Sequence, residues 1–256
     1  MGALTKEKKT TPEAETASAV EIPPTAQTQL VGELVDSARA RAGFYRTIAS
    51  LYLSELDAAG IERLANAIDP GTSLGDATME EGWRDIAAYL RHRDSATRLD
   101  LAVDFAGAIL AAGSYEERKA TPYESVFTSE SGLLMQEARD DVYRLMCEQH
   151  LGVREDLRTP EDHLSFECEF MAKLADRQAQ ALEEGRADEA LAALKAQREM
   201  HANHLLNWID AYCDCLDEAA KTRFYRGVSK LTRGFVHLDE AYIADSLAAV
   251  EELAAS

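Results

Sequence analysis

Residues 160–163, with the sequence Pro-Glu-Asp-His, form the densest group of ionisable side chains that has a clear structural context. Thr159 is a suitable helix cap, and Pro160 suits the first helical position. Glu161 and Asp162 would place negative charge at the positive end of the helix dipole. Asp162 also stands three residues after Thr159, as in a capping box. This pattern predicts a helix that begins at Pro160.

Two interpretations of Pro160, Glu161, Asp162 and His163 remain open. They form a well-capped helix start, or they form a recognition corner in which carboxylates and an imidazole receive Arg or Lys side chains of a peptide. Helix capping already explains three of the four residues, so the physical chemistry alone favours the first interpretation.

An irregular stretch, residues 113–132, contains a second candidate group, in which Tyr123, Glu124, Ser125 and Phe127 follow a proline. Irregular chain of this length inside a compact domain is usually functional or mobile. Aromatic side chains beside a carboxylate suit a peptide with a basic pair next to an apolar run. The same residues would equally suit a loop that its aromatic side chains fix to the core.

Enzyme and metal signatures are absent from the sequence. His201 and His204 have a spacing that could hold a metal ion, but no carboxylate or thiol stands at ligand spacing beside them. We therefore expect a structural role, with His204 able to stack on Trp208 one helical turn later. No histidine has a Glu three residues before it, which argues against a di-iron bundle. Phosphate loops, nucleophile elbows and zinc-protease motifs are also missing.

Apolar residues recur at spacings of three and four along almost the whole chain after Leu30, as is typical of amphipathic helices. We therefore predict an all-α fold, a single large helical domain of about eight to ten helices over residues 29–256. Helices are expected at 30–52, 78–90, 95–112, 133–151, 160–182, 187–220 and from 222 onward, with an interruption near Gly234. In the segment 95–112, the residues expected to face inward are Leu99, Val103, Ala106, Ile109 and Leu110.

Residues 1–28 are rich in Thr, Ala, Glu and Pro and show no helical period, so we predict a disordered N-terminal tail. The chain of 256 residues has a formal net charge of −19. The tail contains three lysines against four glutamates, so nearly all of this charge belongs to the helical domain. Such a surface repels nucleic acid and anionic membranes and would attract a basic peptide, although acidic surfaces also serve solubility.

The four cysteines are predicted to be free thiols in a reducing cytosol. Cys213 and Cys215 would lie about 200° apart around a helix, and no C-x-x-C spacing occurs. The sequence has no apolar run of about 18 residues, the length that a membrane helix needs, and no secretory signal. A cytoplasmic protein is therefore expected.

Several short motifs, in order and spacing, resemble the TorD/DmsD/NarJ-like redox-enzyme maturation chaperones over about residues 38–250. Each motif alone is weak, but the ordered set is specific. The motifs are Asp104-Phe105, Pro122-Tyr123-Glu124-Ser125-Val126-Phe127, Pro160-Glu161-Asp162-His163, Phe170-Met171-x-x-Leu174, His204-x-x-x-Trp208 and Phe224-Tyr225.

The resemblance implies an all-helical, cytoplasmic chaperone that is not an enzyme and has no cofactor or metal of its own. Its implied partner is the twin-arginine signal peptide, or leader, of a molybdenum-dependent (molybdopterin) oxidoreductase in its apo form. Binding would delay export of that enzyme until the cofactor is loaded.

The resemblance also implies which residues bind the leader. The family's proline-Asp-His corner maps to Pro160, Asp162 and His163, and its Tyr-Glu-Ser loop maps to residues 123–125. Many relatives have Glu where this chain has Thr159, so no role of that Glu is carried over. The full set of candidate peptide-binding residues is Tyr123, Glu124, Ser125, Phe127, Pro160, Glu161, Asp162 and His163.

We expect the arginines of a leader to meet carboxylates such as Glu124, Glu161 and Asp162. The apolar part of the leader would lie in a groove lined by Tyr123, Phe127 and neighbouring helices. Apolar burial would supply most of the affinity, and charge would speed the encounter.

Three other functions remain as alternatives. A NarJ-like assembly chaperone would bind the mature catalytic subunit rather than its leader. A nucleotide-dependent switch lacks a phosphate cradle in this sequence, and a helical hydrolase or metalloenzyme lacks the expected motifs. The sequence leaves the client enzyme unspecified and leaves open a homodimer formed by domain swapping.

Overall fold

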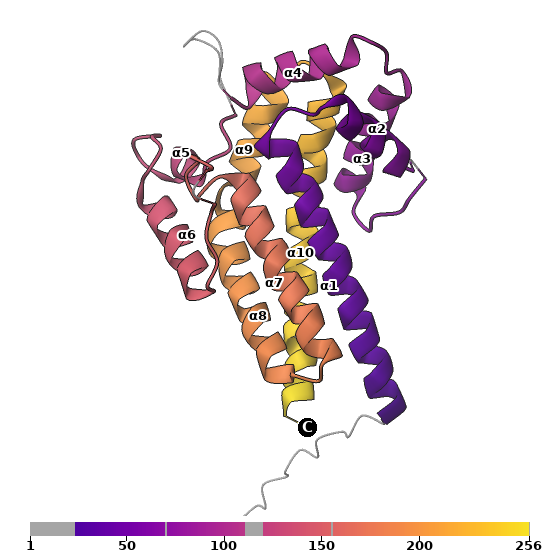
Figure 1. Cartoon of the computed structure of the whole chain (residues 1–256), viewed down its shortest axis with the longest axis vertical. Helices are drawn as coiled ribbons and strands as arrows, with labels where there is room; N and C mark the ends of the chain where they lie inside the picture. Colours follow the sequence, from indigo (N-terminus) through magenta and orange to yellow (C-terminus); the bar gives the residue numbers. More distant parts are fainter. Residues whose placement is uncertain (1–23, 70, 111–119, 155, 256) are drawn as a thin grey trace, which may run out of the picture.

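The protein, described by a computed structural model, is all-α, as the apolar periodicity predicts (Figure 1). The structure describes residues 24–69, 71–110, 120–154 and 156–255. Within these ranges the only β-type pairing is an isolated antiparallel bridge between Tyr123 and His163. The elements are α1 (Pro24–Leu53), α2 (Ala58–Ala67), α3 (Ala77–Arg91), α4 (Thr97–Ala108), α5 (Glu124–Thr128), α6 (Glu137–Glu148), α7 (Leu164–Glu183), α8 (Ala187–Met200), the π-helix η1 (His201–Leu205), α9 (Leu206–Ala219) and α10 (Arg223–Ala254).

An elongated bundle forms the centre of the molecule. α1 packs along α7, α7 along α8, and α10 along α3, α8 and α9. Figure 1 shows α2, α3 and α4 gathered at one end of this bundle, with α5 and α6 on its side. Large side chains fill the interior, including the fully buried Tyr45, Tyr52, Trp208 and Tyr212. Each buried large apolar side chain contributes about 1.5–3 kcal/mol relative to exposure, so this core is the main source of stability.

α10 runs without a break through Gly234, which corrects the predicted interruption. The glycine is there because α3 approaches closely: a Cβ atom on Gly234 would lie 2.5 Å from Oδ1 of Asp76. At the other contact between the two helices, a Cβ atom on Gly82 would lie 2.5 Å from the carbonyl oxygen of Gly227. These glycines allow close packing of helices and do not end a helix.

Other boundaries also differ from the sequence prediction. α1 begins at Pro24, within the segment assigned to the tail, and α6 begins only at Glu137. On α4, Leu101 and Phe105 face the interior, and Ile109 directly after the helix is buried as predicted. The expected inward residues Leu99, Val103 and Leu110 are exposed, because the helix packs only along its Leu101–Phe105 side.

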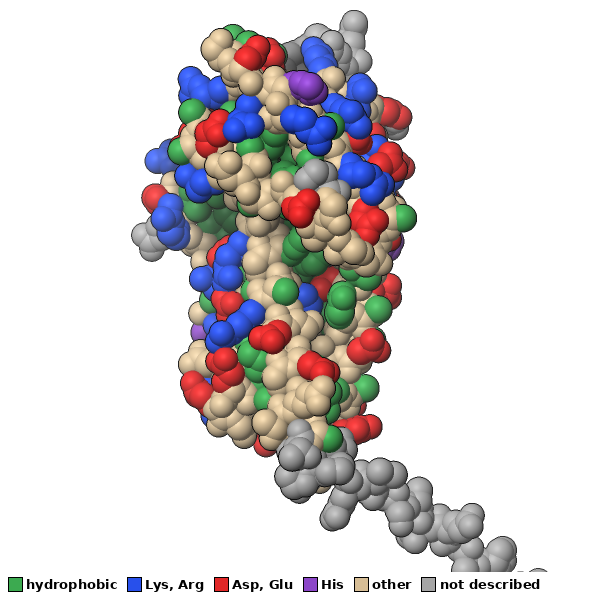
Figure 2. Space-filling model, turned by 90° about the vertical axis from the view of Figure 1, so that its right-hand side faces the viewer, with side chains coloured by type: hydrophobic (Ala, Val, Ile, Leu, Met, Phe, Trp, Pro, Cys, Tyr) green, Lys and Arg blue, Asp and Glu red, His purple; other side chains and the backbone are tan. Residues whose placement is uncertain are grey.

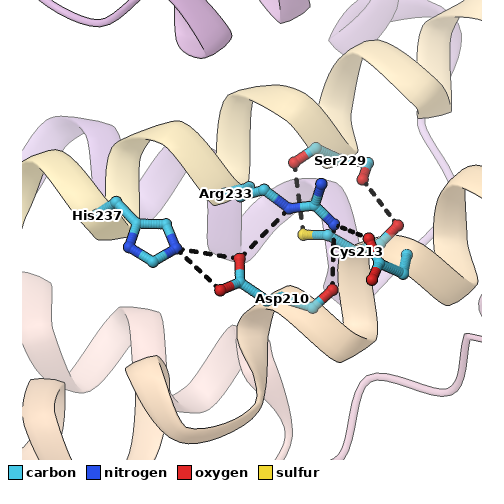
Figure 3. A network of polar contacts seen from close by, with 6 residues as sticks. Asp210, Cys213, Ser229, Arg233 and His237 are labelled. Carbon is cyan, nitrogen blue, oxygen red and sulfur yellow. Dashed lines mark hydrogen bonds and ion pairs between the residues drawn. The ribbon is translucent and has the colours of Figure 1, made fainter.

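The predicted helix 187–220 is divided by η1 into α8 and α9. α9 is fixed to α10 by a polar network that Figure 3 shows from close by. The hydroxyl of Ser229 donates to the carbonyl of Cys213 at 3.1 Å, and the guanidinium of Arg233 donates to the carbonyl of Asp210 at 3.1 Å. His237 contacts the Asp210 carboxylate at 3.0 Å.

None of the four cysteines, all of which lie in the described ranges, forms a disulfide, as predicted. Burial raises the pKa of the Cys213 thiol to about 12, so this side chain behaves as a small apolar group. None of the helices in the described part of the chain has the length and apolar character needed to span a bilayer.

Charge is distributed unevenly over the surface. Figure 2 shows Lys and Arg side chains concentrated in the upper part of one face, whereas Asp and Glu dominate its lower part. The net charge of −19 is therefore not spread uniformly over the molecule.

Candidate functional site

The two candidate groups identified in the sequence are adjacent in space. We call residues 120–136, which contain α5, the α5 segment. Its backbone lies antiparallel to the turn before α7: the N–H of Glu124 donates to the carbonyl of Asp162 at 3.0 Å. The N–H of Leu164 donates to the carbonyl of Pro122 at 2.9 Å. The structure thus joins the two motifs into one unit.

Asp162 caps α5 rather than α7. Its side chain is fully buried, and Oδ2 accepts a hydrogen bond from the backbone N–H of Ser125 at 3.0 Å. This N–H is one of the donors that the first turn of a helix leaves without an intrahelical partner. The Ser125 hydroxyl then accepts from the N–H of Gln136 at 3.2 Å, which closes the α5 segment on itself.

α7 begins at Leu164, so the predicted start at Pro160 with Thr159 as cap is wrong. The cap is His163, whose Nδ1 accepts a hydrogen bond from the N–H of Ser165 at 3.1 Å. The backbone of His163 is extended, because the preceding turn is paired with the α5 segment. A helix start at Pro160 would break that pairing.

His163 is held as a neutral imidazole. Burial lowers its pKa to about 4, and its acceptor role at Nδ1 requires the proton to reside on Nε2. The ring of Tyr123 meets it edge to face, with centroids 4.8 Å apart. Glu161 points away from this pair and bonds to the guanidinium of Arg139 at 2.6 Å.

Glu124 joins the α5 segment to the centre of the bundle. Its side chain is 2% exposed, and its Oε2 accepts from Nδ1 of His204 at 2.8 Å. His204 stands in η1, and π-type turns are frequent at functional sites. Phe127 adds an apolar contact, since its ring stacks on Trp208 with centroids 5.5 Å apart.

Glu167 is a further member of this cluster, and none of the sequence motifs included it. It is fully buried on α7, and its pKa is raised well above its usual range by burial and by the nearby carboxylates of Glu124 and Asp162. Burial therefore favours the neutral acid over the carboxylate at this position. The sequence signal was a carboxylate on the apolar side of an amphipathic helix, between His163 and Phe170.

The burial of this cluster limits what its side chains can contact. Glu124 and Asp162 are closed off from solvent, so an arginine of a peptide cannot reach them while the α5 segment is packed. Of the candidate residues, those with partly exposed side chains are Tyr123, Phe127, Pro160 and Glu161. Within the described ranges, no group of three or more His, Cys, Asp or Glu could hold a metal ion.

Comparison with known proteins identifies the family. A family model described as nitrate reductase delta subunit matches residues 74–214. The Chaperone protein TorD of Photobacterium profundum is 32% identical over 163 residues, which cover 64% of this chain and 72% of that protein. The Chaperone protein TorD of Vibrio parahaemolyticus is 28% identical over 210 residues, 79% of this chain and 94% of that protein. The protein of the same name from Aliivibrio fischeri is 26% identical over 220 residues, 84% of this chain and 99% of that protein. The chain therefore belongs to the TorD-like family of system-specific chaperones for redox-enzyme maturation, a family of non-enzymatic proteins.

Proposed function

We propose that this chaperone binds the twin-arginine signal peptide of a molybdenum-dependent oxidoreductase in the cytoplasm, before the enzyme is exported. Binding would hold back the apo enzyme until its cofactor is loaded. The observation that carries the proposal is the joining of the two family motifs, around residues 123–127 and 160–163, into one packed unit.

The motif residues act in this proposal mainly by holding the binding surface in shape. Asp162 fixes the first turn of α5, His163 fixes the first turn of α7, and Glu124 ties the α5 segment to His204. Because these three side chains are buried, they would support leader binding by shaping the surface and not by contacting the leader. Tyr123 and Phe127, which are partly exposed, remain available for direct contact.

The overall charge supports a basic ligand. A surface with a net charge of −19 attracts a peptide that carries a pair of arginines, and it repels nucleic acid. The same charge would give little help in binding a large folded enzyme whose surface carries both signs.

Calorimetric titration with leader peptides tests the proposal. We expect one leader to bind at micromolar concentration or tighter, with about a tenfold loss of affinity when both of its arginines become alanine. The mature oxidoreductase without its leader serves as the second ligand. Binding to the mature subunit alone would contradict the proposal and assign the protein to the NarJ-like type of assembly chaperone.

A further inference from the structure

A hollow of about 490 Å³ lies between the second half of α1, the start of α7 and the chain that follows α6. This volume is within the range typical of ligand sites. Its walls are largely apolar, and they include Leu53, Met146, Leu157, Phe166 and Phe170. The hollow adjoins the motif unit, because Ser165 and Phe166 stand two and three residues after His163, the cap residue of α7.

The charged side chains at this hollow are paired with each other or with immediate neighbours. Arg154 bonds to Asp156 at 3.1 Å, and Lys173 lies 3.6 Å from Glu169. Arg46 pairs with Asp176. Each of the three cations that line the hollow is therefore paired with a carboxylate, in a protein that is otherwise strongly acidic. An uncharged apolar segment fits such a hollow better than a basic one.

A second hollow, of about 470 Å³, adjoins the first, and Ser50 of α1 lines both. Its character is acidic: Glu55 and Asp57 stand against a single cation, Arg63. Asp57 also caps α2 through the N–H of Gly60 at 2.6 Å, so Glu55 is the freer of the two carboxylates.

The end of α1 adds to the attraction for cations at the second hollow. α1 is a helix of 30 residues that ends at Leu53, and its last turn contains no basic residue. The carbonyl groups of a helix C-terminus carry partial negative charge that favours a bound cation. Figure 1 shows this end of α1 beside α7, where the chain turns towards α2.

We infer that the two hollows form one peptide site across the end of α1. The apolar run of the peptide occupies the first hollow, and its arginine pair lies over Glu55 in the second. The occupant follows from complementarity, since an apolar hollow beside an acidic one matches a chain with an apolar run beside a basic pair. This inference rests on the proposed function and places the bound leader on α1, beyond the motif residues themselves.

The test uses two surface variants of the full chain, each with a matched control. Leu53→Lys puts a charge at the edge of the apolar hollow, and Leu99→Lys makes the same change on an exposed leucine of α4. Glu55→Lys reverses charge in the acidic hollow, and Glu251→Lys does so near the end of α10. All four side chains are exposed, so the fold should tolerate each change.

We expect titration with the leader to show about a tenfold loss of affinity for Leu53→Lys and about a fivefold loss for Glu55→Lys. The two controls should bind as the wild type does. The effect of Glu55→Lys should shrink when the arginines of the leader are replaced by alanine, and the effect of Leu53→Lys should shrink when its apolar run is made polar. A leader carrying a photo-crosslinking group in the apolar run should react with α1 and α7.

Normal leader binding by both variants, or crosslinks confined to residues 123–127, would overturn this inference and leave the proposed function in place. If the effect of Leu53→Lys shrank when the arginines of the leader were replaced, and not when its apolar run was made polar, the proposed orientation of the leader would be wrong. If the wild type binds no leader, the proposed function and this inference both fail.

Discussion

At the scale of single residues, the main feature is a set of ionisable groups held in their neutral or paired forms inside the protein. Glu124 bonds to His204, whereas Glu167 and His163 are forced towards neutrality by burial. Each shifted pKa links stability to pH, and the two shifts act in opposite pH directions.

The change Glu167→Gln should remove a pH-dependent loss of stability. The folded pKa of Glu167 lies above its unfolded value, so the native state binds more protons, and wild-type stability falls as pH rises above about 4.3. The loss is at most about 1.4 kcal/mol per pH unit for one proton. In urea unfolding between pH 5 and 8, the free energy of unfolding of the variant should therefore increase relative to that of the wild type as pH rises. Glu169→Gln, on the exposed side of the same helix, is the control; parallel curves for wild type and Glu167→Gln would contradict this prediction.

The change His163→Asn should alter the pH dependence of stability on the acidic side of neutrality. The folded pKa of about 4 is below the unfolded value of 6.5, so the unfolded state binds the extra proton and wild-type stability falls as pH drops from 6.5 towards 4. Asparagine can still cap α7 but does not titrate in this range. As pH drops over this interval, the free energy of unfolding of the variant should therefore increase relative to that of the wild type. Denaturant titrations at pH 7, 5.5 and 4.5 measure it, and a constant difference would show that His163 does not titrate as described.

At the scale of helices, apolar periodicity was sufficient to predict an all-α fold and the approximate position of α1, α3, α7 and α10. Helix starts were less predictable, because they depend on partners far away in the sequence. Asp162 caps a helix 37 residues earlier in the chain, and Glu124 pairs with a histidine 80 residues later. No local pattern contains that information, so the motif residues were identified from the sequence but their contacts were not.

Gly234 allows a test of whether a residue is set by packing against a distant helix or by its local helix propensity. Gly234→Ala should destabilise the protein by about 1–3 kcal/mol, because the new methyl group would overlap Asp76 and Met79 of the neighbouring α3 region. Gly43→Ala, in α1, meets nothing within 4 Å and should stabilise the protein by about 0.5–1 kcal/mol. Thermal and urea unfolding of the two variants provide the comparison. Equal effects of the two substitutions would show that α3 and α10 do not pack as closely as described.

At the scale of the whole molecule, the net charge of −19 and the apolar hollow would make different contributions to the proposed binding of a leader. Charge acts at long range and is screened over about 10 Å at 0.1 M salt, whereas apolar burial acts only on contact. The association rate should therefore depend on salt much more strongly than the dissociation rate does.

Stopped-flow measurements with a labelled leader between 0.05 and 0.5 M salt would test this division. We expect the association rate constant to fall about tenfold or more over this range, while the dissociation rate constant changes by about twofold or less. Affinity should decrease but not vanish, because burial of the apolar run persists at high salt. The Glu251→Lys variant serves as the control, since it alters the net charge as much as Glu55→Lys does, but Glu251 lines neither hollow. A salt-independent association rate would contradict long-range attraction by the acidic surface. A dissociation rate that rises steeply with salt would instead mean that ion pairs, and not the apolar hollow, hold the bound leader in place.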